Sequence, residues 1–373
     1  MKRILHVVSC LERGGTEAFI MNHYRMIDRA EYQFDFLVFH EKTYPYTEEI
    51  RNLGGRIFFC TPPSRKDIFR SIKEMTECMK NHGPFRAVHS HMNIENAWVM
   101  VAAKFAGIPV RVSHSHDTKG REGTGIIGLY RHFQSMLIKL FANRIAACGI
   151  AAGNYLYGER FFKKRGCVIH NGIDVARFQN VSEEALLIRK KEFAISEEQD
   201  LVFGNITRFE DKKNQMFALE VFREVAGCLP NAVLLLGGPD GGRLGAVMEK
   251  TSELGLADRV RFIGERDDIP ACLNLIDIYL FPSLYEGLPI ALLEAQAAGC
   301  FCISSTEVSA EADMGIGQLV FCGLADGTKQ WADVIDQKAI KHSRPEAKAV
   351  QEAFKKNGYD IRFSAQKLMD LYE

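Results

Sequence analysis

The chain has 373 residues, enough for two domains of ordinary size, and 47% of them are hydrophobic while 25% are charged. These values are typical of globular proteins with full cores, and they exclude a disordered, collagen-like or coiled-coil chain. The 47 basic and 47 acidic side chains cancel, which argues against a nucleic-acid binder held by net positive charge. Residues 1–172 nevertheless carry 25 Lys and Arg against 15 Asp and Glu, so this half should favour anionic surfaces or substrates.

In the first half of the chain, short runs of β-branched and aromatic residues alternate with longer amphipathic segments. The runs predict strands over 4–8, 34–39, 56–59, 87–89 and 110–113. The segments between them predict helices over 16–28, 68–80 and 95–106. Alternation of this kind is typical of a parallel sheet covered by helices on both faces.

The second half repeats this alternation without repeating the sequence. Strands are predicted over 201–206, 232–236, 260–263, 278–281 and 301–304. Helices are predicted over 183–192, 214–226, 244–254, 269–275 and 289–298, followed by one or two more over 347–372. The fold class is therefore α/β, with two doubly wound domains that meet near the Asn171-Gly172 turn.

Cysteine usage and hydropathy indicate the compartment. The ten cysteines form no CxxC pair, which indicates reduced thiols in a cytosolic protein. The apolar run at the N-terminus is too short for a signal peptide, and no stretch reaches the ~18 uncharged apolar residues of a spanning helix. We therefore expect a cytoplasmic protein without a transmembrane segment.

The strongest motif follows the predicted strand 278–281 and reads Phe-Pro-Ser-Leu-Tyr-Glu-Gly-Leu-Pro-Ile-Ala-Leu-Leu-Glu-Ala. Pro289 suits the first position of a helix, whose free N–H groups would bind a phosphate, and Gly287 lets the backbone approach that ligand. Glu286 lies in the loop, and Glu294 lies in the second turn, where ribose hydroxyls could be its partners. Alternatively, Glu286 compensates the helix dipole and Glu294 is simply solvated. The residues alone favour neither interpretation.

A second motif follows the first strand of the second half, at Thr-Arg-Phe-Glu-Asp-Lys-Lys-Asn. Arg208 and Lys213 could form a two-pronged clamp for a diphosphate. The alternative is an exposed loop whose charges balance locally, and spacing alone favours that alternative.

Two glycine loops also follow strands. Gly14 and Gly15 occupy a phosphate-cradle position, but the pattern is neither GxGxxG nor GxxxxGK[ST], and a tight turn with Thr16 as helix cap explains it equally well. Asp35 lies inside its strand, not at the end where a ribose-binding acid would be expected, so a nicotinamide-dependent enzyme is a weak interpretation. The loop 237–242 is equally ambiguous.

Histidines and a basic run complete the candidates. His89 and His91, and His114 and His116, lie at strand ends, where His-x-His can bind a metal, but no convincing further ligands are evident. Each is more simply a structural histidine, with His116 the best candidate to reach a cleft. The segments 129–143 and 159–165 combine apolar and basic residues and could lie on an anionic membrane, although a solvated helix end is the simpler interpretation.

Through these motifs the chain resembles a family 4 retaining glycosyltransferase of the GT-B architecture, and the resemblance extends over essentially its whole length. The resemblance rests on the N-terminal glycine loop, the His-Ser-His strand end, Asn-Gly-Ile-Asp near the junction and the Arg208–Lys213 spacing. Its most specific part is Glu286 with seven residues before Glu294. It implies an N-terminal domain of residues 1–172 joined by C-terminal helices from about 355 to 373, and a sugar-nucleotide domain of residues 173–354.

The resemblance also implies roles for these residues. The catalytic residues would be His116 facing the transferred sugar, Arg208 and Lys213 neutralising the leaving diphosphate, and Glu286 contacting the donor sugar. The sugar nucleotide would be bound by Gly14, Gly15, Arg208, Lys213, Glu286, Gly287, Leu288, Pro289, Ile290 and Glu294. Such enzymes commonly have glycine where this chain has Thr207, and His114 is an alternative to His116.

The implied reaction is transfer of a hexosyl or N-acetylhexosaminyl group from a sugar nucleotide, with UDP favoured, and with retention of configuration. The acceptor would be a saccharide or lipid-diphosphate-linked saccharide in bacterial surface polysaccharide synthesis, and it would be reached at the inner membrane face. No cofactor, metal or nucleic acid is expected. Alternatives are a GT-B sugar-nucleotide epimerase and a nonenzymatic sugar-nucleotide-binding protein.

Overall fold

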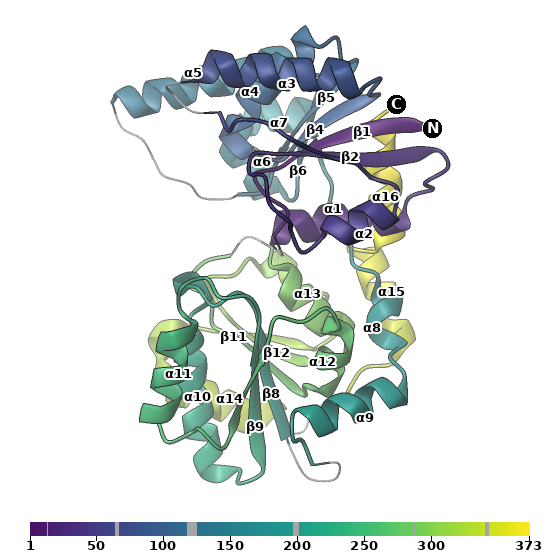
Figure 1. Cartoon of the computed structure of the whole chain (residues 1–373). Coiled ribbons are helices and arrows are strands. Elements are labelled where there is room, and N and C mark those ends of the chain that lie inside the picture. The colour runs from purple at the N-terminus through teal and green to yellow at the C-terminus, as the bar shows by residue number, and fades with distance from the viewer. Residues whose placement is uncertain (13, 64–66, 118–124, 197–200, 287, 340–342) are drawn as a thin grey trace. The chain divides into compact units, whose positions relative to one another are not determined.

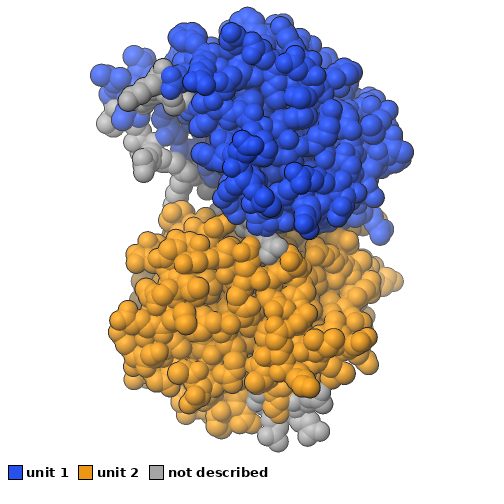
Figure 2. Space-filling view, viewed as in Figure 1, with its two compact units in different colours: residues 1–172, 361–373 blue, residues 173–360 orange. Residues whose placement is uncertain are grey.

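The structure is a computed structural model that describes residues 1–12, 14–63, 67–117, 125–196, 201–286, 288–339 and 343–373. The chain divides into two compact units, drawn in blue and orange in Figure 2. Unit 1 comprises residues 1–172 and 361–373, and unit 2 comprises residues 173–360. Each unit is built on one parallel sheet.

Unit 1 contains seven strands in the order β3-β2-β1-β4-β5-β6-β7. The strands are β1 (Lys2–Val7), β2 (Tyr32–Val38), β3 (Ile57–Phe59), β4 (Ala87–Ser90), β5 (Val110–Ser115), β6 (Arg144–Ala147) and β7 (Gly166–Val168). The α-helices are α1 (Gly15–Met26), α2 (Thr47–Asn52), α3 (Ile68–His82), α4 (Asn96–Phe105), α5 (Ile126–Phe141), α6 (Ile150–Tyr157), α7 (Glu159–Arg165) and α16 (Ile361–Asp370). Helices connect the parallel strands because a parallel pair needs a crossover.

Both faces of the unit 1 sheet are buried. Leu5 and Val7 of β1 point into one apolar cluster and Ile4 into another, as the alternation of side chains along a strand requires. The last helix, α16, contributes Leu368 to the second cluster and lies against α1, as the yellow end of the chain shows in Figure 1. The predicted return of the C-terminal helix to the first domain is therefore confirmed.

Unit 2 contains six strands in the order β10-β9-β8-β11-β12-β13. The strands are β8 (Leu201–Ile206), β9 (Ala232–Gly237), β10 (Val260–Gly264), β11 (Ile278–Phe281), β12 (Phe301–Ser305) and β13 (Leu319–Cys322). The α-helices are α8 (Val175–Gln179), α9 (Glu183–Glu192), α10 (Gln215–Cys228), α11 (Leu244–Glu253), α12 (Ile269–Leu275), α13 (Ile290–Ala297), α14 (Gly327–Val334) and α15 (Ala347–Lys356). One large cluster, which includes the fully buried Trp331, forms its core.

The predicted α/β class and GT-B-like pair of doubly wound sheets match the structure, and every predicted strand is present. β6, β7 and β13 lie outside the predicted set. β6 reads Arg-Ile-Ala-Ala, and its two alanines carry no strand preference, so its pairing between β5 and β7 decides its conformation. β13 is a four-residue strand at the edge of its sheet.

When strands are counted along the chain within each unit, both sheets share the order 3-2-1-4-5-6, and the unit 1 sheet adds a seventh strand beside the sixth. In such a sheet the connections leave in opposite directions from the two central strands, which opens a crevice at their carboxyl ends. These central pairs are β1 with β4 and β8 with β11. All ten cysteines have free thiols, as predicted. Among the described residues, no helix has the length and hydropathy needed to cross a bilayer.

Candidate active site

The strongest predicted motifs meet at the β8–β11 crevice of unit 2. The loop after β8 carries Arg208 and Lys213, and the loop after β11 carries Glu286. The two loops are joined by a backbone hydrogen bond in which the Leu284 N–H donates to the Lys212 carbonyl oxygen over 2.8 Å. The sheet order, not sequence proximity, therefore brings these residues together.

Lys213 and Glu286 form the central ion pair of this site. Lys213 Nζ lies 2.5 Å from Glu286 Oε1, and the two side chains are only 14% and 13% exposed. Lys213 Nζ also lies 5.2 Å from the centre of the Phe281 ring. Partial burial strengthens the attraction between the two charges, so each side chain holds the other in place at the carboxyl end of the sheet.

Lys212 is a second cation beside Glu286, and its sequence context did not indicate a role for it. Its Nζ lies 3.6 Å from Glu286 Oε1 and 3.7 Å from Glu210 Oε1. Burial works to lower the pKa of Lys212, but the nearby carboxylates outweigh it and raise the pKa above its ordinary value. Lys212 is therefore charged at neutral pH, and with Arg208 and Lys213 the loop presents three cations instead of the predicted two.

The backbone around Arg208 is held by buried side chains. Thr207 Oγ1 donates to Asn205 Oδ1 over 2.6 Å, and Gln215 Nε2 donates to Thr207 Oγ1 and to the Arg208 carbonyl oxygen. Thr207 is thus a buried part of the loop's hydrogen bonding.

The glycine loop 237–242 packs against the same segment. Gly238 has φ of +131°, and a Cβ there would lie 2.2 Å from the Thr207 carbonyl oxygen. A Cβ on Gly241 would lie 2.7 Å from the Phe209 carbonyl oxygen and 3.0 Å from the Arg208 side chain. Close approach to the Arg208 loop accounts for these glycines without a ligand.

Helix α13 begins one residue later than predicted. Pro289 precedes the helix with ψ of 117°, which is extended, so Ile290 is the first helical residue. The first N–H groups of a helix have no partners within it. In α13 the Leu292 N–H already donates to the Pro289 carbonyl oxygen, so the predicted phosphate-binding groups are the N–H groups before it, those of Ile290 and Ala291. Leu288 and Pro289 lead into this turn, Glu294 is half-buried one turn further on, and Gly287 lies outside the described residues.

In unit 1, the glycine loop leads into α1 at the β1–β4 crevice. α1 begins at Gly15 with Gly14 as N-cap, so Thr16 is not the cap, contrary to the alternative interpretation. The carboxylate of Glu17 folds back over Gly14, where a Cβ would lie 2.5 Å from Glu17 Oε2. A Cβ on Gly15 would meet no atom within 4 Å, so packing explains Gly14 but not Gly15.

The structure separates the two histidine candidates. His114 is fully buried in β5, whereas His116 is half-buried just beyond the end of that strand. The His116 backbone N–H donates to Asn93 Oδ1 over 3.0 Å, and Asn93 Nδ2 donates to Asp117 Oδ2 over 2.6 Å. Asn93 was not identified from the sequence. The feature that distinguishes Asn93 is its backbone, which has a positive φ of +50°. A sequence does not show a backbone angle, so the residue could not have been singled out from it.

Asp35, which lies inside β2, has partners that leave it no role as a ribose-binding acid. It is fully buried and accepts hydrogen bonds from the Arg3 and Arg56 guanidinium groups at 2.6–3.2 Å. This pairing is structural, and it agrees with the weak case for a nicotinamide cofactor.

Family models cover most of the chain. The model described as Glycosyltransferase Family 4 matches residues 13–177, and the model described as Glycosyl transferases group 1 matches residues 188–316. The putative glycosyltransferase EpsF of Bacillus subtilis is 33% identical over 381 residues, which cover 100% of this chain and 96% of EpsF. The chain belongs to glycosyltransferase family 4.

A further relative and a solved structure are also similar to this chain. The capsular polysaccharide biosynthesis glycosyltransferase CapH of Staphylococcus aureus is 25% identical, with 100% of this chain and 99% of CapH covered. The crystal structure of Anabaena Alr3699/HepE in complex with UDP and glucose matches with a TM-score of 0.79 at 17% identity, covering 99% of both chains. The predicted family and GT-B architecture are confirmed. The roles of the individual site residues remain predictions.

Proposed function

We propose that this protein is a retaining, metal-independent glycosyltransferase that moves a hexosyl or N-acetylhexosaminyl group from a UDP-sugar to a saccharide or lipid-diphosphate-linked saccharide. The observation that carries the proposal is the Lys213–Glu286 pair beside the start of α13. Its cation and the N-terminus of α13 suit a diphosphate, and the carboxylate suits sugar hydroxyls. The UDP and glucose bound by the structurally similar HepE support this donor class.

The proposed chemistry needs charge stabilisation at the leaving group. When the glycosidic bond breaks, negative charge develops on the departing diphosphate. Arg208, Lys213 and the first N–H groups of α13 neutralise that charge, so the mechanism requires no divalent cation. Glu286 orients the donor sugar and does not act as a covalent nucleophile, while Glu294 binds the ribose hydroxyls. In unit 1, Gly15 approaches the phosphates and His116 contacts the transferred sugar.

Thermal unfolding with candidate nucleotides tests the donor class first. A ligand at 100 times its dissociation constant adds ~2.7 kcal/mol of stability, so UDP should raise the unfolding temperature clearly. Glu294→Ala should abolish that increase because it removes the proposed ribose contact, whereas Glu253→Ala, an exposed carboxylate at the end of α11, should retain it. An increase with NAD alone, or with none of UDP, GDP, ADP and NAD, would contradict the proposal.

Product analysis separates a transferase from the two alternatives. A retaining transferase forms a new glycoside with the donor's anomeric configuration, and only when a saccharide or lipid-linked acceptor is added. An epimerase instead changes the free sugar nucleotide without an acceptor, and a binding protein changes nothing. Transfer that persists in EDTA supports the metal-independent mechanism, and transfer that EDTA abolishes contradicts it.

A surface on unit 1 supports an acceptor held at a membrane. Helix α5 exposes a row of apolar side chains at alternating spacings of three and four residues, which places them on one helical face. They are Ile126, Leu129, Phe133, Met136 and Leu140, with exposed fractions of 43–84%. Lys163, Lys164 and Arg165 of α7 are exposed, and Lys139 of α5 stacks on Phe161 of α7, which brings the two helices together. We therefore propose that α5 and α7 bind an anionic bilayer peripherally, at the cytoplasmic face.

Vesicle sedimentation tests this surface. The protein should bind vesicles of phosphatidylcholine with phosphatidylglycerol and bind less as salt is added, because the basic residues are attracted electrostatically. The triple variant Leu129→Ser, Phe133→Ser, Leu140→Ser should bind more than tenfold more weakly, since each inserted side chain contributes about 1.5–3 kcal/mol. Leu187→Ser, which changes an exposed leucine of α9 in unit 2, is the control. Equal binding of the triple variant and the control would exclude this surface.

A further inference from the structure

Five histidines line one face of the unit 1 sheet, and the proposed mechanism uses only His116. They come from three adjacent strands: His6 from β1, His89 and His91 from β4 and just beyond it, and His114 and His116 from β5 and just beyond it. Residues two apart on a strand face the same side, and His6 is paired directly with His89. The strand register therefore gathers the five rings into one cluster.

The rings form two hydrogen-bonded rows. In the first row, His6 Nδ1 lies 3.0 Å from His91 Nε2, and His91 Nδ1 lies 2.8 Å from His116 Nε2. This row runs from the sheet interior to the strand end where His116 is half-buried. In the second row, His89 lies 3.0 Å from His114 and 2.7 Å from the Tyr372 hydroxyl.

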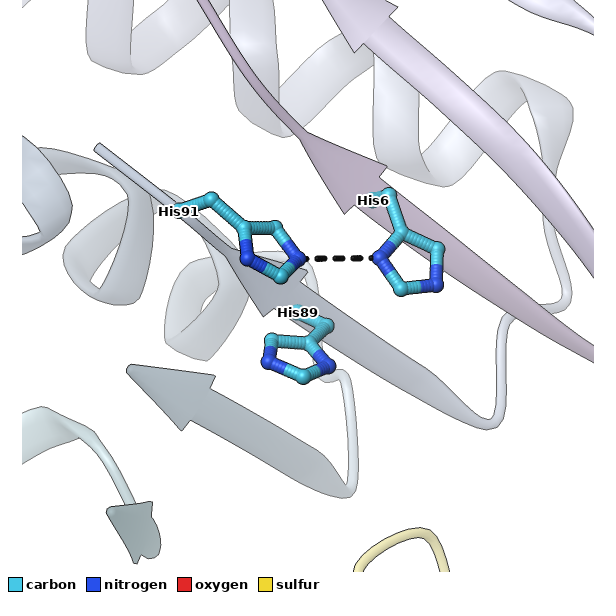
Figure 3. A group of neighbouring side chains, drawn as sticks. All are labelled: His6, His89 and His91. Carbon is cyan, nitrogen blue, oxygen red and sulfur yellow. Dashed lines mark hydrogen bonds between the residues drawn. The ribbon is translucent and has the colours of Figure 1, made fainter. Parts of the chain in front are cut away.

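The geometry favours hydrogen bonds over a metal ion. His6, His89 and His91 have ligand atoms within 4.8 Å of one another, as do His91, His114 and His116. Figure 3 shows, however, that the nitrogens of His6 and His91 face each other directly, and their rings are inclined by only 18°. His89 stacks on His91 at 4.3 Å, so its lone pairs lie in a nearly parallel plane and do not converge on a common point. Both groups consist of neutral ligands alone, which would leave a divalent charge buried without a counter-charge.

Proton counting sets the direction of the first row. Burial lowers the pKa of His6 and of His116 to about 3 and also lowers that of His91, so at neutral pH each ring carries one N–H. His6 Nε2, at the inner end, is buried and has no hydrogen-bond partner. If the row donated inward, His6 Nε2 would carry a buried N–H without an acceptor, which is rarer and costlier than an unpaired lone pair. The row therefore donates outward, from His6 to His91 and from His91 to His116.

We infer that His91 and His6 are positioning residues that hold His116 as its neutral Nδ1–H tautomer, so that His116 presents an N–H donor at the carboxyl end of β5. Free imidazole side chains in water favour the Nε2–H form, so the tautomer is imposed by the row. Resting on the proposed function, this inference implies that Nδ1–H donates to an oxygen of the transferred sugar. His116 cannot then act as a general base through Nδ1, because that nitrogen already carries its proton.

Histidine-labelled protein gives a readout that does not depend on activity. A long-range ¹H–¹⁵N correlation spectrum at pH 7.5 should show His116, assigned by its loss in His116→Gln, as the Nδ1–H tautomer. Tyr372→Phe changes only the second row and should leave the His116 signals in place. An Nε2–H tautomer or a protonated ring at His116 would overturn the inference. So would stoichiometric binding of Co²⁺ or Zn²⁺ with ligand-induced shifts of these histidine nitrogens.

Two substitutions of His91 separate positioning from folding. His91→Asn keeps an N–H donor near the position of His91 Nδ1, so it should preserve the His116 tautomer and most of kcat. His91→Leu removes the donor, so His116 should shift toward Nε2–H and kcat should fall about tenfold, the equivalent of one hydrogen bond. Equal kcat and equal tautomers in the two variants would overturn the role of His91. If His116 shows Nδ1–H while no sugar transfer is found, the proposed function fails and the positioning does not.

Discussion

Unit 1 should lose stability steeply between pH 6.5 and pH 5, while unit 2 should not. His6 and His23 are fully buried, and burial lowers their pKa values to about 3 and about 4. In the unfolded chain they titrate near pH 6.5. As the pH falls below 6.5, these histidines therefore bind protons in the unfolded state but not in the folded state, and the free energy of unfolding decreases.

The expected size follows from this linkage. Each such histidine lowers the unfolding free energy by up to about 1.4 kcal/mol per pH unit. Because the unfolded ring is already half protonated at pH 6.5, His6 and His23 together cost about 3 kcal/mol between pH 6.5 and pH 5. Burial lowers the pKa values of His89, His91 and His114 in the same direction, which adds to the loss. For a domain of this size, a loss of about 3 kcal/mol corresponds to a fall of about 9 °C in Tm. It is also a large share of the 5–15 kcal/mol by which domains are usually stable.

The chain supplies its own control. Ten of the eleven histidines belong to unit 1, and His342 is the one in the sequence of unit 2. Calorimetry at pH 7, 6 and 5 should therefore show one transition that moves and one that stays nearly constant. His23→Gln keeps a hydrogen-bonding side chain without a titrating group, so its pH slope should be smaller by about one proton. A Tm of unit 1 that does not change down to pH 5 would show that the buried histidines are not neutral in the folded state.

The fold was largely predictable because its strands are buried on both faces. A strand covered by helices on both sides appears in sequence as a short apolar run. Ile278–Phe281 is a clear example, and Phe34–Phe39 is interrupted only by Asp35. β6 lacks that pattern and β7 has only three residues, so their place depends on neighbouring strands, which a local sequence window does not include. β13 reads Leu-Val-Phe-Cys and has the pattern, but the sequence prediction missed it.

The sequence motifs of the candidate site could be recognised in advance, but the contacts between their side chains could not. The loop of Arg208 to Lys213 looks balanced by its own acidic residues, yet Asp211 pairs with Arg243 and Lys213 pairs with Glu286, 73 residues away. That exchange of partners follows from β8 lying beside β11, which strand order alone decides. The histidine cluster is hidden for the same reason: within the predicted strand 4–8 His6 is the one polar residue, and its histidine neighbours become evident only when β1 pairs with β4.

Lys213→Ala should lower kcat by about 10²–10³, the usual effect of removing one group that stabilises charge developing in a transition state. The KM for the sugar nucleotide should change much less, because Arg208, Lys212 and the start of α13 still attract the diphosphate. Lys213→Arg should restore part of the activity at most, since a planar guanidinium does not fit the 2.5 Å contact that the ammonium group makes with Glu286. Lys250→Ala, which breaks an ion pair with Glu220 elsewhere in unit 2, is the matched control.

A double-mutant cycle distinguishes a catalytic Lys213 from one that only neutralises Glu286. If Lys213 merely balanced the carboxylate, removing both charges with Lys213→Ala and Glu286→Ala would restore activity relative to Lys213→Ala alone. If both side chains contact the sugar nucleotide, the double variant should be at least as impaired as the less active of the two single variants. Because the two side chains are in direct contact, their effects should also fall well short of additivity. Wild-type kcat in Lys213→Ala would remove the central cation from the proposed mechanism, and stabilisation of the leaving group would then have to come from Arg208 and α13.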